Sequence, residues 1–433
     1  MADTICIFED PQYVKLLPLV YTRPVYDLRC GILTLREKIQ RACSKANIAL
    51  LCRPYLADVV KQQNSNVQVN EVHATNCLLI NGRVIADEQF AKKIPLKGKD
   101  AVYISGNTVV AVRMSAGGHV SMKHDFSETF DVEHFAELER IPVDVKLIEY
   151  PWHLVGSNGE QIVADFKSLV KAKDKSKKAT VYTGAHLLNK KNIFIDSGAT
   201  VKPGVVLDAE SGPIYIGKNA KIFPNAVIEG PAFIGANTLI KIGAKIYENT
   251  SIGEMCKVGG EVEASIIHSY SNKQHDGFLG HSYLGMWCNL GADTNNSDLK
   301  NNYGHVKVQV NGKMVDSGSQ FVGLTMGDHS KSGINTMFNT GTVVGVSSNV
   351  FGAGFPPKFI PSFSWGGADG LETYDIEKGI DVARRVMARR KVEMTEADEK
   401  LLNKVFELTR EERKRMKRDE ELVLIPPPFG KKN

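Results

Sequence analysis

One histidine stands out as a residue that could do chemistry. His281 lies in the segment Gly280-His281-Ser282-Tyr283-Leu284-Gly285, at the edge of an insertion in an otherwise regular part of the chain. Imidazole titrates near neutral pH, so it is the side chain best suited to act as a general base there. The alternative is a histidine in a solvated loop. Three further histidines, His275, His305 and His329, are expected to be structural.

The regular part that surrounds this histidine repeats every six residues. An aliphatic side chain recurs at Ile216, Ile222, Ile228, Ile234, Ile240, Ile246, Ile252 and Val258. Neither an amphipathic helix nor an alternating strand has this period. A fixed short period indicates stacked units that bury one residue each, and six residues suit one flat side of a β-solenoid coil. The same step continues at Ile195, Val201, Leu207, Leu284, Leu290, Phe338, Val344 and Val350.

The sequence also predicts where the solenoid is interrupted and where it ends. We expect it to begin near Ile193 and to carry two irregular insertions, 265–280 and 293–318, of a kind that is often functional. The Pro-, Phe- and Gly-rich stretch 352–367 should stop it. Residues 370–420 look helical, with Thr395 as an N-cap and with an apolar stripe of Leu401, Leu402, Val405 and Phe406.

The residues before the solenoid alternate between short apolar runs and helical patterns. Strands are expected at 4–8, 49–52 and 77–80, helices at 33–45, 55–63 and 161–171, and a hairpin at 101–114 around Ser105-Gly106-Asn107. Asp87 could cap another short helix. This alternation favours an α/β domain with a mainly parallel sheet. The lysine-rich stretch 171–178 reads as a linker, which gives domains at 1–175, 176–367 and 368–433.

Composition narrows the class of protein. The chain is 42% hydrophobic and 24% charged, without a run of about twenty apolar residues, so we expect no membrane span. Seven scattered cysteines without a CxxC pair argue against disulfides and structural zinc. The basic stretch 384–418 is interleaved with Glu, which is typical of a solvated helix and not of a nucleic-acid site. We expect a cytoplasmic protein.

The repeat and its insertions resemble a known family. The six-residue period is similar to the left-handed parallel β-helix of hexapeptide acyltransferases. Gly280–Gly285, the following Asn289-Leu290-Gly291-Ala292 and then Asn302-Tyr303-Gly304 resemble motifs of the bifunctional UDP-N-acetylglucosamine pyrophosphorylase/glucosamine-1-phosphate N-acetyltransferases. The first-domain segments Leu16–Pro24, Asp27–Gly31 and Tyr150–Leu154, and the later Gly327–Lys331 and Phe355–Lys358, are similar to a divergent, Bacteroidetes-type branch of that family.

This resemblance implies an acyltransferase site in the β-helix. His281 would be the catalytic base, Tyr283 would contact the sugar phosphate or position the base, and Asn302 and Tyr303 would bind the sugar. Tyr283 could equally be an aromatic packing residue, and Asn302 and Tyr303 could be turn residues. Acetyl-CoA would lie along the β-helix between subunits of a homotrimer. The family's phosphate-binding arginine falls near Tyr247 and its lysine near Ser265, so the sequence departs from the family at the acceptor sugar.

For the first domain the resemblance implies transfer of a nucleotide from UTP or another NTP to a sugar 1-phosphate, with Mg²⁺. Thr22, Arg23 and Arg29 would bind phosphates, although the family's phosphate loop has lost its glycines here. Asn81 occupies the place of the family's metal-binding aspartate. An asparagine amide is a poorer Mg²⁺ ligand than a carboxylate. Asp87 could serve in its stead, and Asn158, in a stretch that precedes a helix, would be a second metal ligand. Arg23 and Arg29 could equally be surface arginines, and Asn158 a helix cap.

Three hypotheses follow from the sequence. The first is an enzyme of sugar-nucleotide biosynthesis that N-acetylates an amino-sugar 1-phosphate, either alone or together with transfer of a nucleotide. The second keeps only nucleotidyl transfer, with the β-helix used for oligomerisation. The third is a non-catalytic regulatory or scaffold protein.

Overall fold

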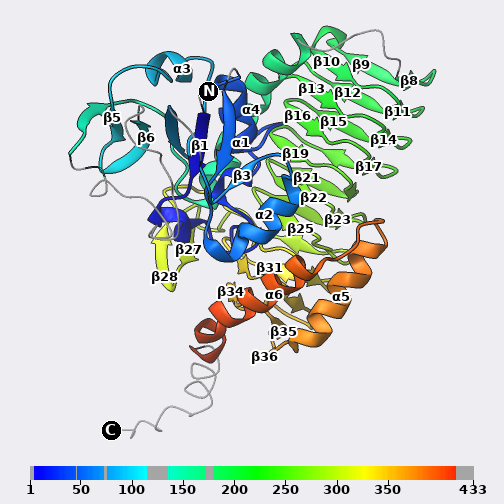
Figure 1. The fold of residues 1–433 in the computed structure, drawn as a ribbon. Coiled ribbons are helices and arrows are strands. Elements are labelled where there is room, and N and C mark those ends of the chain that lie inside the picture. The colour runs from blue at the N-terminus through cyan, green and yellow to red at the C-terminus, as the bar shows by residue number, and fades with distance from the viewer. Residues whose placement is uncertain are drawn as a thin grey trace, which may run out of the picture.

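The computed structural model describes residues 4–44, 46–72, 76–114, 135, 137–171 and 179–415. It contains an α/β domain, a long parallel β-helix beside it, and two C-terminal helices that close the lower end of both (Figure 1). The expected fold class is confirmed in this arrangement of α/β domain, parallel β-helix and C-terminal helices. Of the expected linker, all residues after Lys171 lie outside the described residues.

The first domain is built on a seven-stranded sheet with the order β3-β2-β1-β4-β6-β5-β7. Its four strands β3, β2, β1 and β4 are parallel, and β6 runs antiparallel to both β4 and β5. The strands are β1 (Thr4–Phe8), β2 (Asn47–Leu50), β3 (Gln68–Val69), β4 (Cys77–Asn81), β5 (Ala101–Ser105), β6 (Thr108–Met114) and β7 (Glu139–Pro142). The helices are α1 (Leu35–Ala42), α2 (Ala57–Gln63), α3 (Phe90–Lys93) and α4 (Pro151–Lys171).

The expected helices of this domain are present, but one is longer than the sequence indicates. Thr34 caps α1 with a capping box to Glu37, which fixes its start. Asp87 accepts a hydrogen bond from the Gln89 backbone just before α3. The helix expected at 161–171 begins ten residues earlier, at Pro151. Its first ten residues include Gly156 and Gly159, two glycines inside the helix.

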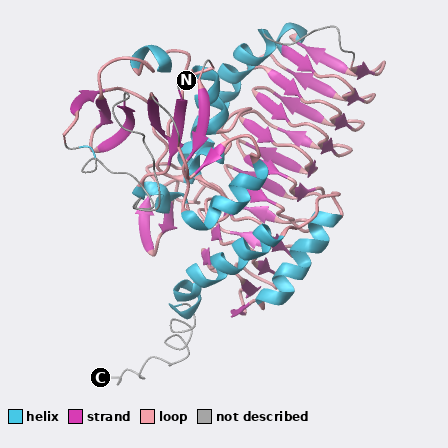
Figure 2. Ribbon diagram, in the orientation of Figure 1, coloured by secondary structure: helices cyan, strands magenta, loops and turns pink. Residues whose placement is uncertain are grey.

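The β-helix has three flat faces, each built of stacked short strands, which are magenta in Figure 2. We call them the first, second and third face. The first face is one nine-stranded parallel sheet: β10 (Ile193–Ile195), β13 (Ile214–Ile216), β16 (Ala232–Ile234), β19 (Thr250–Ile252), β22 (Ile266–Ser269), β25 (Tyr283–Met286), β29 (Thr325–Met326), β32 (Val343–Val344) and β34 (Phe359–Ile360).

The other two faces are each divided into two ladders. The second face contains β8 (Thr180–Val181), β11 (Thr200–Val201), β14 (Lys221–Ile222), β17 (Leu239–Ile240), β20 (Lys257–Val258) and β23 (Asn272–Lys273), then β30 (Lys331–Ser332), β33 (Asn349–Val350), β35 (Ser364–Gly367) and β36 (Gly370–Thr373). The third face contains β9 (His186–Leu188), β12 (Val206–Asp208), β15 (Val227–Glu229), β18 (Lys245–Ile246), β21 (Glu261–Glu263) and β24 (Phe278–Gly280), then β26 (Asn295–Asn296) and β31 (Met337–Phe338).

The six-residue period predicts the core of the β-helix correctly. All eight aliphatic residues from Ile216 to Val258 are buried in one hydrophobic cluster, together with the later positions and with Val201 and Leu207, whereas Ile195 is half-buried against it. The β-helix begins earlier than expected, because β8 and β9 already pair with β11 and β12.

Two expectations about interruptions are wrong. Residues 265–280 are not an irregular insertion but a complete coil of β22, β23 and β24. The period is hidden there because the inward slot of β23 holds Lys273, in register with Val258. The stretch 352–367 does not end the solenoid either, since β34 and β35 add a further coil. The second insertion, after β26, exists and carries an antiparallel hairpin of β27 (Lys307–Val310) and β28 (Lys313–Asp316).

Corners between faces contain residues in the left-handed conformation, and this explains much of the Gly and Asn content. Between the second and third faces these residues include Gly204, Asn225, Gly243, Gly260 and Gly277, of the types that tolerate positive φ best. Two other corner columns depart from this rule. Ala264 and His281 occupy the corner between the third and first faces, and the larger Tyr270, Trp287 and His329 occupy the corner between the first and second faces.

The first domain and the C-terminal helices cover the first face. Helix α4 lies against β16, β19 and β25, and Gly159 permits this approach because a Cβ there would clash with Asn249. Helices α5 (Ile376–Ala388) and α6 (Glu396–Leu408) share a hydrophobic cluster with the first domain, which includes the expected Leu401, Leu402 and Val405. Thr395 caps α6 as predicted. No helix among the described residues is long and apolar enough to span a membrane.

Candidate active site

His281 forms a histidine–carboxylate pair at a corner of the β-helix. Its Nδ1 lies 2.8 Å from Oδ2 of Asp298, which follows β26 on the next coil. A carboxylate accepts hydrogen bonds, so the pair holds the proton on Nδ1 and leaves Nε2 as a free base. The imidazole side chain is 24% exposed, which makes that nitrogen reachable from outside.

The backbone around His281 is built for this pair. His281 has φ of +45°, where the preceding coils of the same corner column have Asn249 and Ala264. A large side chain in this conformation costs free energy, and such strain concentrates at functional sites. Gly280 is needed as well, because a Cβ there would clash with Asp298 Oδ2. Asn296 fixes Gly280 from both sides, accepting from its N–H at 2.9 Å and donating to its carbonyl at 3.0 Å.

The insertion after β26 supplies the rest of this surface. The ring of Phe321 stacks on His281 with 4.9 Å between centroids. Asn302 and Tyr303 lie on the same insertion, where the Asn302 side chain accepts from Gly304 N–H and Gln320 donates to the Tyr303 carbonyl. Tyr303 is 67% exposed. Their role in binding sugar stays a prediction, since these bonds are those of a turn.

Tyr283 lies elsewhere than the resemblance implies. Its side chain is fully buried between the first domain and the β-helix, and its hydroxyl accepts from the Arg29 N–H at 2.9 Å and donates to the Arg29 carbonyl at 3.3 Å. No surface of the side chain is left for a sugar. Tyr283 instead anchors the loop between β1 and α1 to the β-helix.

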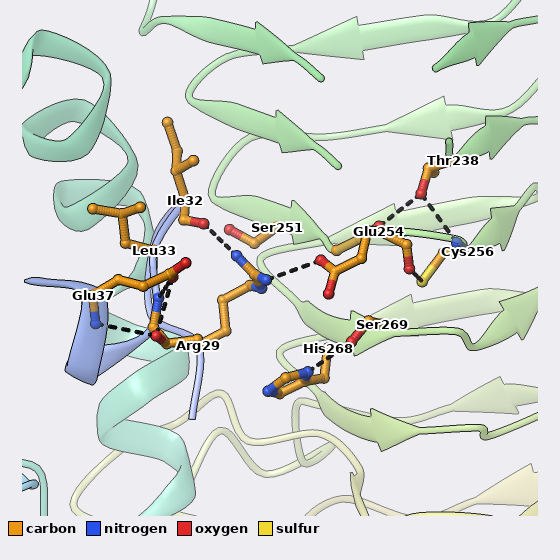
Figure 3. Close-up of polar contacts among 12 residues, drawn as sticks. Arg29, Ile32, Leu33, Glu37, Thr238, Ser251, Glu254, Cys256, His268 and Ser269 are labelled. Carbon is orange, nitrogen blue, oxygen red and sulfur yellow. Dashed lines mark hydrogen bonds and ion pairs between the residues drawn. The ribbon is translucent and has the colours of Figure 1, made fainter. Parts of the chain in front are cut away.

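The three expected phosphate-binding residues lie on that loop and face the β-helix. Thr22 and Arg23 both bond to Asp328 Oδ2, and Arg29 pairs with Glu254 at 3.1 Å (Figure 3). Arg23 and Arg29 are buried, so they are not surface arginines. Thr22, Arg23 and Arg29 therefore lie close together, whereas Asn81 lies in another part of the first domain.

Asn81 lies at the carboxyl ends of the parallel strands. Buried side chains of the protein itself occupy the space there. Glu9, after β1, receives two bonds from the Arg53 guanidinium, at 3.0 and 3.1 Å. Asp10 receives Arg83 Nε at 2.9 Å and Asn81 Nδ2 at 2.9 Å. All five side chains are buried. Ligands of open α/β sheets bind where strand order reverses, here between β1 and β4, and this network occupies that place.

The residues expected to bind Mg²⁺ do not form a metal site. Asp87 is exposed and lies 3.9 Å from Lys93, whereas Asn81 is buried with its amide fully used. Asn158 is neither before a helix nor a helix cap but inside α4, where it accepts from Gly31 N–H and donates to the Asn249 carbonyl. Within the described residues no group of three His, Cys, Asp or Glu side chains could hold a metal ion. The donors therefore do not fit the expected Mg²⁺.

Sequence reasoning missed Asp298 and Phe321. Asp298 lies in the expected insertion 293–318, in which the sequence indicated only Asn302 and Tyr303 as site residues, and Phe321 lies three residues beyond it. Asp298 is seventeen positions from His281, close to the length of one coil, and this spacing is the signal that could have found it.

Comparisons with known proteins find a separate similarity for the first domain. Residues 5–174 match the family model described as sugar nucleotidyl transferase. The chain is 33% identical over 203 residues to the bifunctional protein GlmU of Methanococcus aeolicus, covering 41% of this chain and 44% of that protein. It is 29% identical over 212 residues to a bifunctional sugar-1-phosphate nucleotidylyltransferase/acetyltransferase of Sulfurisphaera tokodaii, covering 46% and 52%.

A solved structure also matches, at a low score. The UDP-N-acetylglucosamine acyltransferase of Francisella novicida covers 57% of this chain and 90% of that one, with 14% identity and a TM-score of 0.32. The chain spans about half or less of the first curated relatives that it matches. Residues 5–174 are thus similar to sugar nucleotidyl transferases, and the chain is similar over part of its length to bifunctional GlmU-type proteins.

Proposed function

We propose that this protein is an enzyme of sugar-nucleotide biosynthesis that transfers an acetyl group from acetyl-CoA to the amine of an amino-sugar 1-phosphate such as glucosamine 1-phosphate. The observation that carries the proposal is the His281–Asp298 pair, with Nε2 free at a strained corner of the β-helix. The names of the bifunctional relatives support the reaction class.

His281 would act as the general base in this reaction. The amine nitrogen of the sugar attacks the thioester carbonyl carbon, and Nε2 of His281 takes the proton that this nitrogen loses. The C–S bond then breaks, and CoA leaves as its thiolate. Asp298 keeps the proton on Nδ1 and stabilises the imidazolium that forms. A positioned base of this kind contributes about 10²–10⁴ in rate.

Two lysines near the same corner column would meet the phosphates of acetyl-CoA. Lys300 follows Asp298, and Lys358 lies just before β34. Burial, and then the nearby charge of Lys300, lower the pKa of Lys358, so the two cations lie near each other. Phosphate oxygens would supply a counter-charge.

A homotrimer fits the free surfaces of the β-helix. The first domain and the C-terminal helices cover the first face, so copies would meet through the other two. Ile242 and Ile334 support this, because both lie at the corner between the second and third faces and are 69% and 70% exposed. We infer that acetyl-CoA would lie between neighbouring copies.

Nucleotidyl transfer from UTP or another NTP is the second candidate function, and the family match over residues 5–174 favours it. The closed strand ends give no place for a nucleotide at the position the fold class predicts. This activity would therefore need a site other than the Asn81 edge.

One assay tests both functions. Purified protein is incubated with glucosamine 1-phosphate and acetyl-CoA, with and without UTP and Mg²⁺, and the products are identified by mass spectrometry. N-acetylglucosamine 1-phosphate is expected, and its UDP form appears only if the first domain is active. No acetylated product would refute the acyltransferase proposal for this acceptor.

The matched variant is His281→Asn, which suits the turn better than His281→Ala would. Asn is the residue that Asn189 and Asn249 supply in the same corner column, so the turn is kept while the base is lost. We expect acetyl transfer to fall by about 10²–10⁴, with thermal stability unchanged or higher. Wild-type activity in this variant would show that His281 is not the base.

A further inference from the structure

One hydrophobic cluster joins the first domain to the insertion that borders His281. Its buried members are Trp152, Val306, Val308, Val310, Val322 and Val343. Trp152 lies at the start of α4, in the first domain, whereas the valines belong to the insertion and to β32. The hairpin of β27 and β28 accordingly lies beside the first domain (Figure 1). We call this set of residues the hairpin cluster.

Val322 connects the hairpin cluster to the His281–Asp298 pair. Its N–H donates to the Asp298 carbonyl at 2.9 Å. The N–H of the following Gly323 donates to the His281 carbonyl at 3.0 Å, and the preceding Phe321 stacks its ring on the imidazole. Three consecutive residues thus contact both members of the pair, and the side chain of the middle one is anchored in the hairpin cluster.

The first domain holds Trp152 firmly. Tyr150 stacks on the indole almost in parallel, with 4.4 Å between centroids, and His153 meets both rings edge-on at 5.4 and 6.0 Å. The chain just before α4 is tied to the end of β4, because the Ile148 N–H donates to the Arg83 carbonyl at 2.9 Å. The Arg83 guanidinium in turn donates to the Ile148 carbonyl at 2.8 Å. The indole is therefore a fixed support for the insertion.

Trp152 acts there through its ring and not through its polar group. Its side chain is buried, and Nε1 has no hydrogen-bond partner among the residues that the structure describes. A buried indole usually pairs this N–H, and leaving it unpaired costs free energy. A phenylalanine would offer a flat ring without that cost, which makes it the conservative replacement.

We propose that Trp152 is a positioning residue for acetyl transfer, through which the first domain keeps Asp298 aligned with His281 and Phe321 over the imidazole. This inference rests on the proposed function, because it concerns the same base. It gives the first domain a part in the acyltransferase reaction that requires no nucleotide. Residues 321–323 would lose the support of their middle side chain without the indole, and a misplacement of about 1 Å in a catalytic group can cost about 100-fold in rate.

The test compares three changes in the hairpin cluster of the full chain. Trp152→Leu leaves a gap beside Val322, and we expect kcat for acetyl transfer to fall by up to about 100-fold with KM for both substrates nearly unchanged. Val322→Ala should lower kcat in the same way, and the double variant should lose less than the product of the two single losses. Trp152→Phe should keep kcat close to that of wild type.

Phe166→Leu is the matched control. Phe166 lies on the same helix, is 9% exposed and packs with Tyr215 and Phe233 on the first face, several coils before His281. This variant should lose thermal stability without a change in kcat. All variants are assayed at a temperature where circular dichroism shows them folded. An equal fall of kcat in Phe166→Leu and Trp152→Leu would assign the effect to general destabilisation and overturn the proposal, as would wild-type kcat in Trp152→Leu.

A second measurement does not depend on acetyl transfer. Diethyl pyrocarbonate acylates neutral imidazole nitrogens, and peptide mass spectrometry gives the rate of modification at His281. We expect this rate to rise in Trp152→Leu, because Phe321 no longer stays over the ring, and to equal wild type in Phe166→Leu and Trp152→Phe. If wild type shows no acetyl transfer, the proposed function fails by itself. An unchanged modification rate in Trp152→Leu would then refute the positioning role separately.

Discussion

The carboxyl ends of the first-domain strands and the His281 corner of the β-helix use their polar groups in opposite ways. At the strand ends, Glu9 and Asp10 are each bound by a buried arginine, and Asn81 has no free amide atom. At the corner, Asp298 takes up one nitrogen of His281, and the other has no hydrogen-bond partner among the residues that the structure describes. The comparison teaches that polar groups can be consumed by internal pairing at one place in the molecule while a histidine–carboxylate pair at another keeps one nitrogen unpaired.

The largest expected effect is a loss of stability when an ion pair at the strand ends is broken. In Arg83→Met, Asp10 loses its buried partner, and we expect the free energy of unfolding in urea to fall by about 3–5 kcal/mol. Arg384→Met is the matched control, because its pair with Glu399 is exposed and should contribute less than about 1 kcal/mol.

A different result would reverse the interpretation of that edge. If Arg83→Met is as stable as the control but loses nucleotidyl transfer, the edge is a substrate site and its ion pairs are only a resting arrangement. If both stability and transfer fall, a comparison at a temperature where the variant is still folded separates the two effects.

A smaller effect is expected at the corner. In Gly280→Ala the added Cβ would clash with Asp298 and push it away from His281. Loss of a group that orients a catalytic imidazole typically costs about 10–100-fold, and we expect kcat for acetyl transfer to fall by that factor with KM nearly unchanged. A rise in KM with unchanged kcat would mean that Gly280 shapes the binding surface and does not position the base.

The sequence could predict features that depend on local pattern. The period from Ile216 to Val258 gave the β-helix core, Thr4–Phe8 matches β1 residue for residue, and Thr395 caps α6. The turn at Ser105-Gly106-Asn107 likewise joins β5 and β6.

Features that depend on which distant segments meet could not be predicted. Asp10 finds Arg83 only because β1 lies beside β4, and Asp298 meets His281 only because one coil separates them. Tyr283 looked like a substrate ligand because nothing in its own segment shows that the β1–α1 loop covers it. The coil at 265–280 was missed because a lysine stands where the period requires an aliphatic residue.

The smallest expected effect concerns that lysine, Lys273. It allows a buried charge without a carboxylate partner to be compared with the paired arginines at the strand ends. Lys273 is 2% exposed, and its ammonium donates to the His275 carbonyl at 2.8 Å. Burial lowers its pKa from 10.5 to about 8. Arg53 and Arg83, by contrast, are buried with a carboxylate each, so their charges are compensated at the strand ends.

Because the folded pKa of Lys273 lies below the unfolded one, the unfolded chain binds more protons between pH 8 and pH 10.5. Stability therefore rises with pH across that window, and below it the full cost of the buried charge is present. Lys273→Met fits the apolar slot and should raise the free energy of unfolding at pH 7 by about 1–2 kcal/mol, an advantage that shrinks as the pH approaches 10.5. A constant difference between variant and wild type at pH 7, 8, 9 and 10 would show that the ammonium is already compensated in the fold, as the two arginines are.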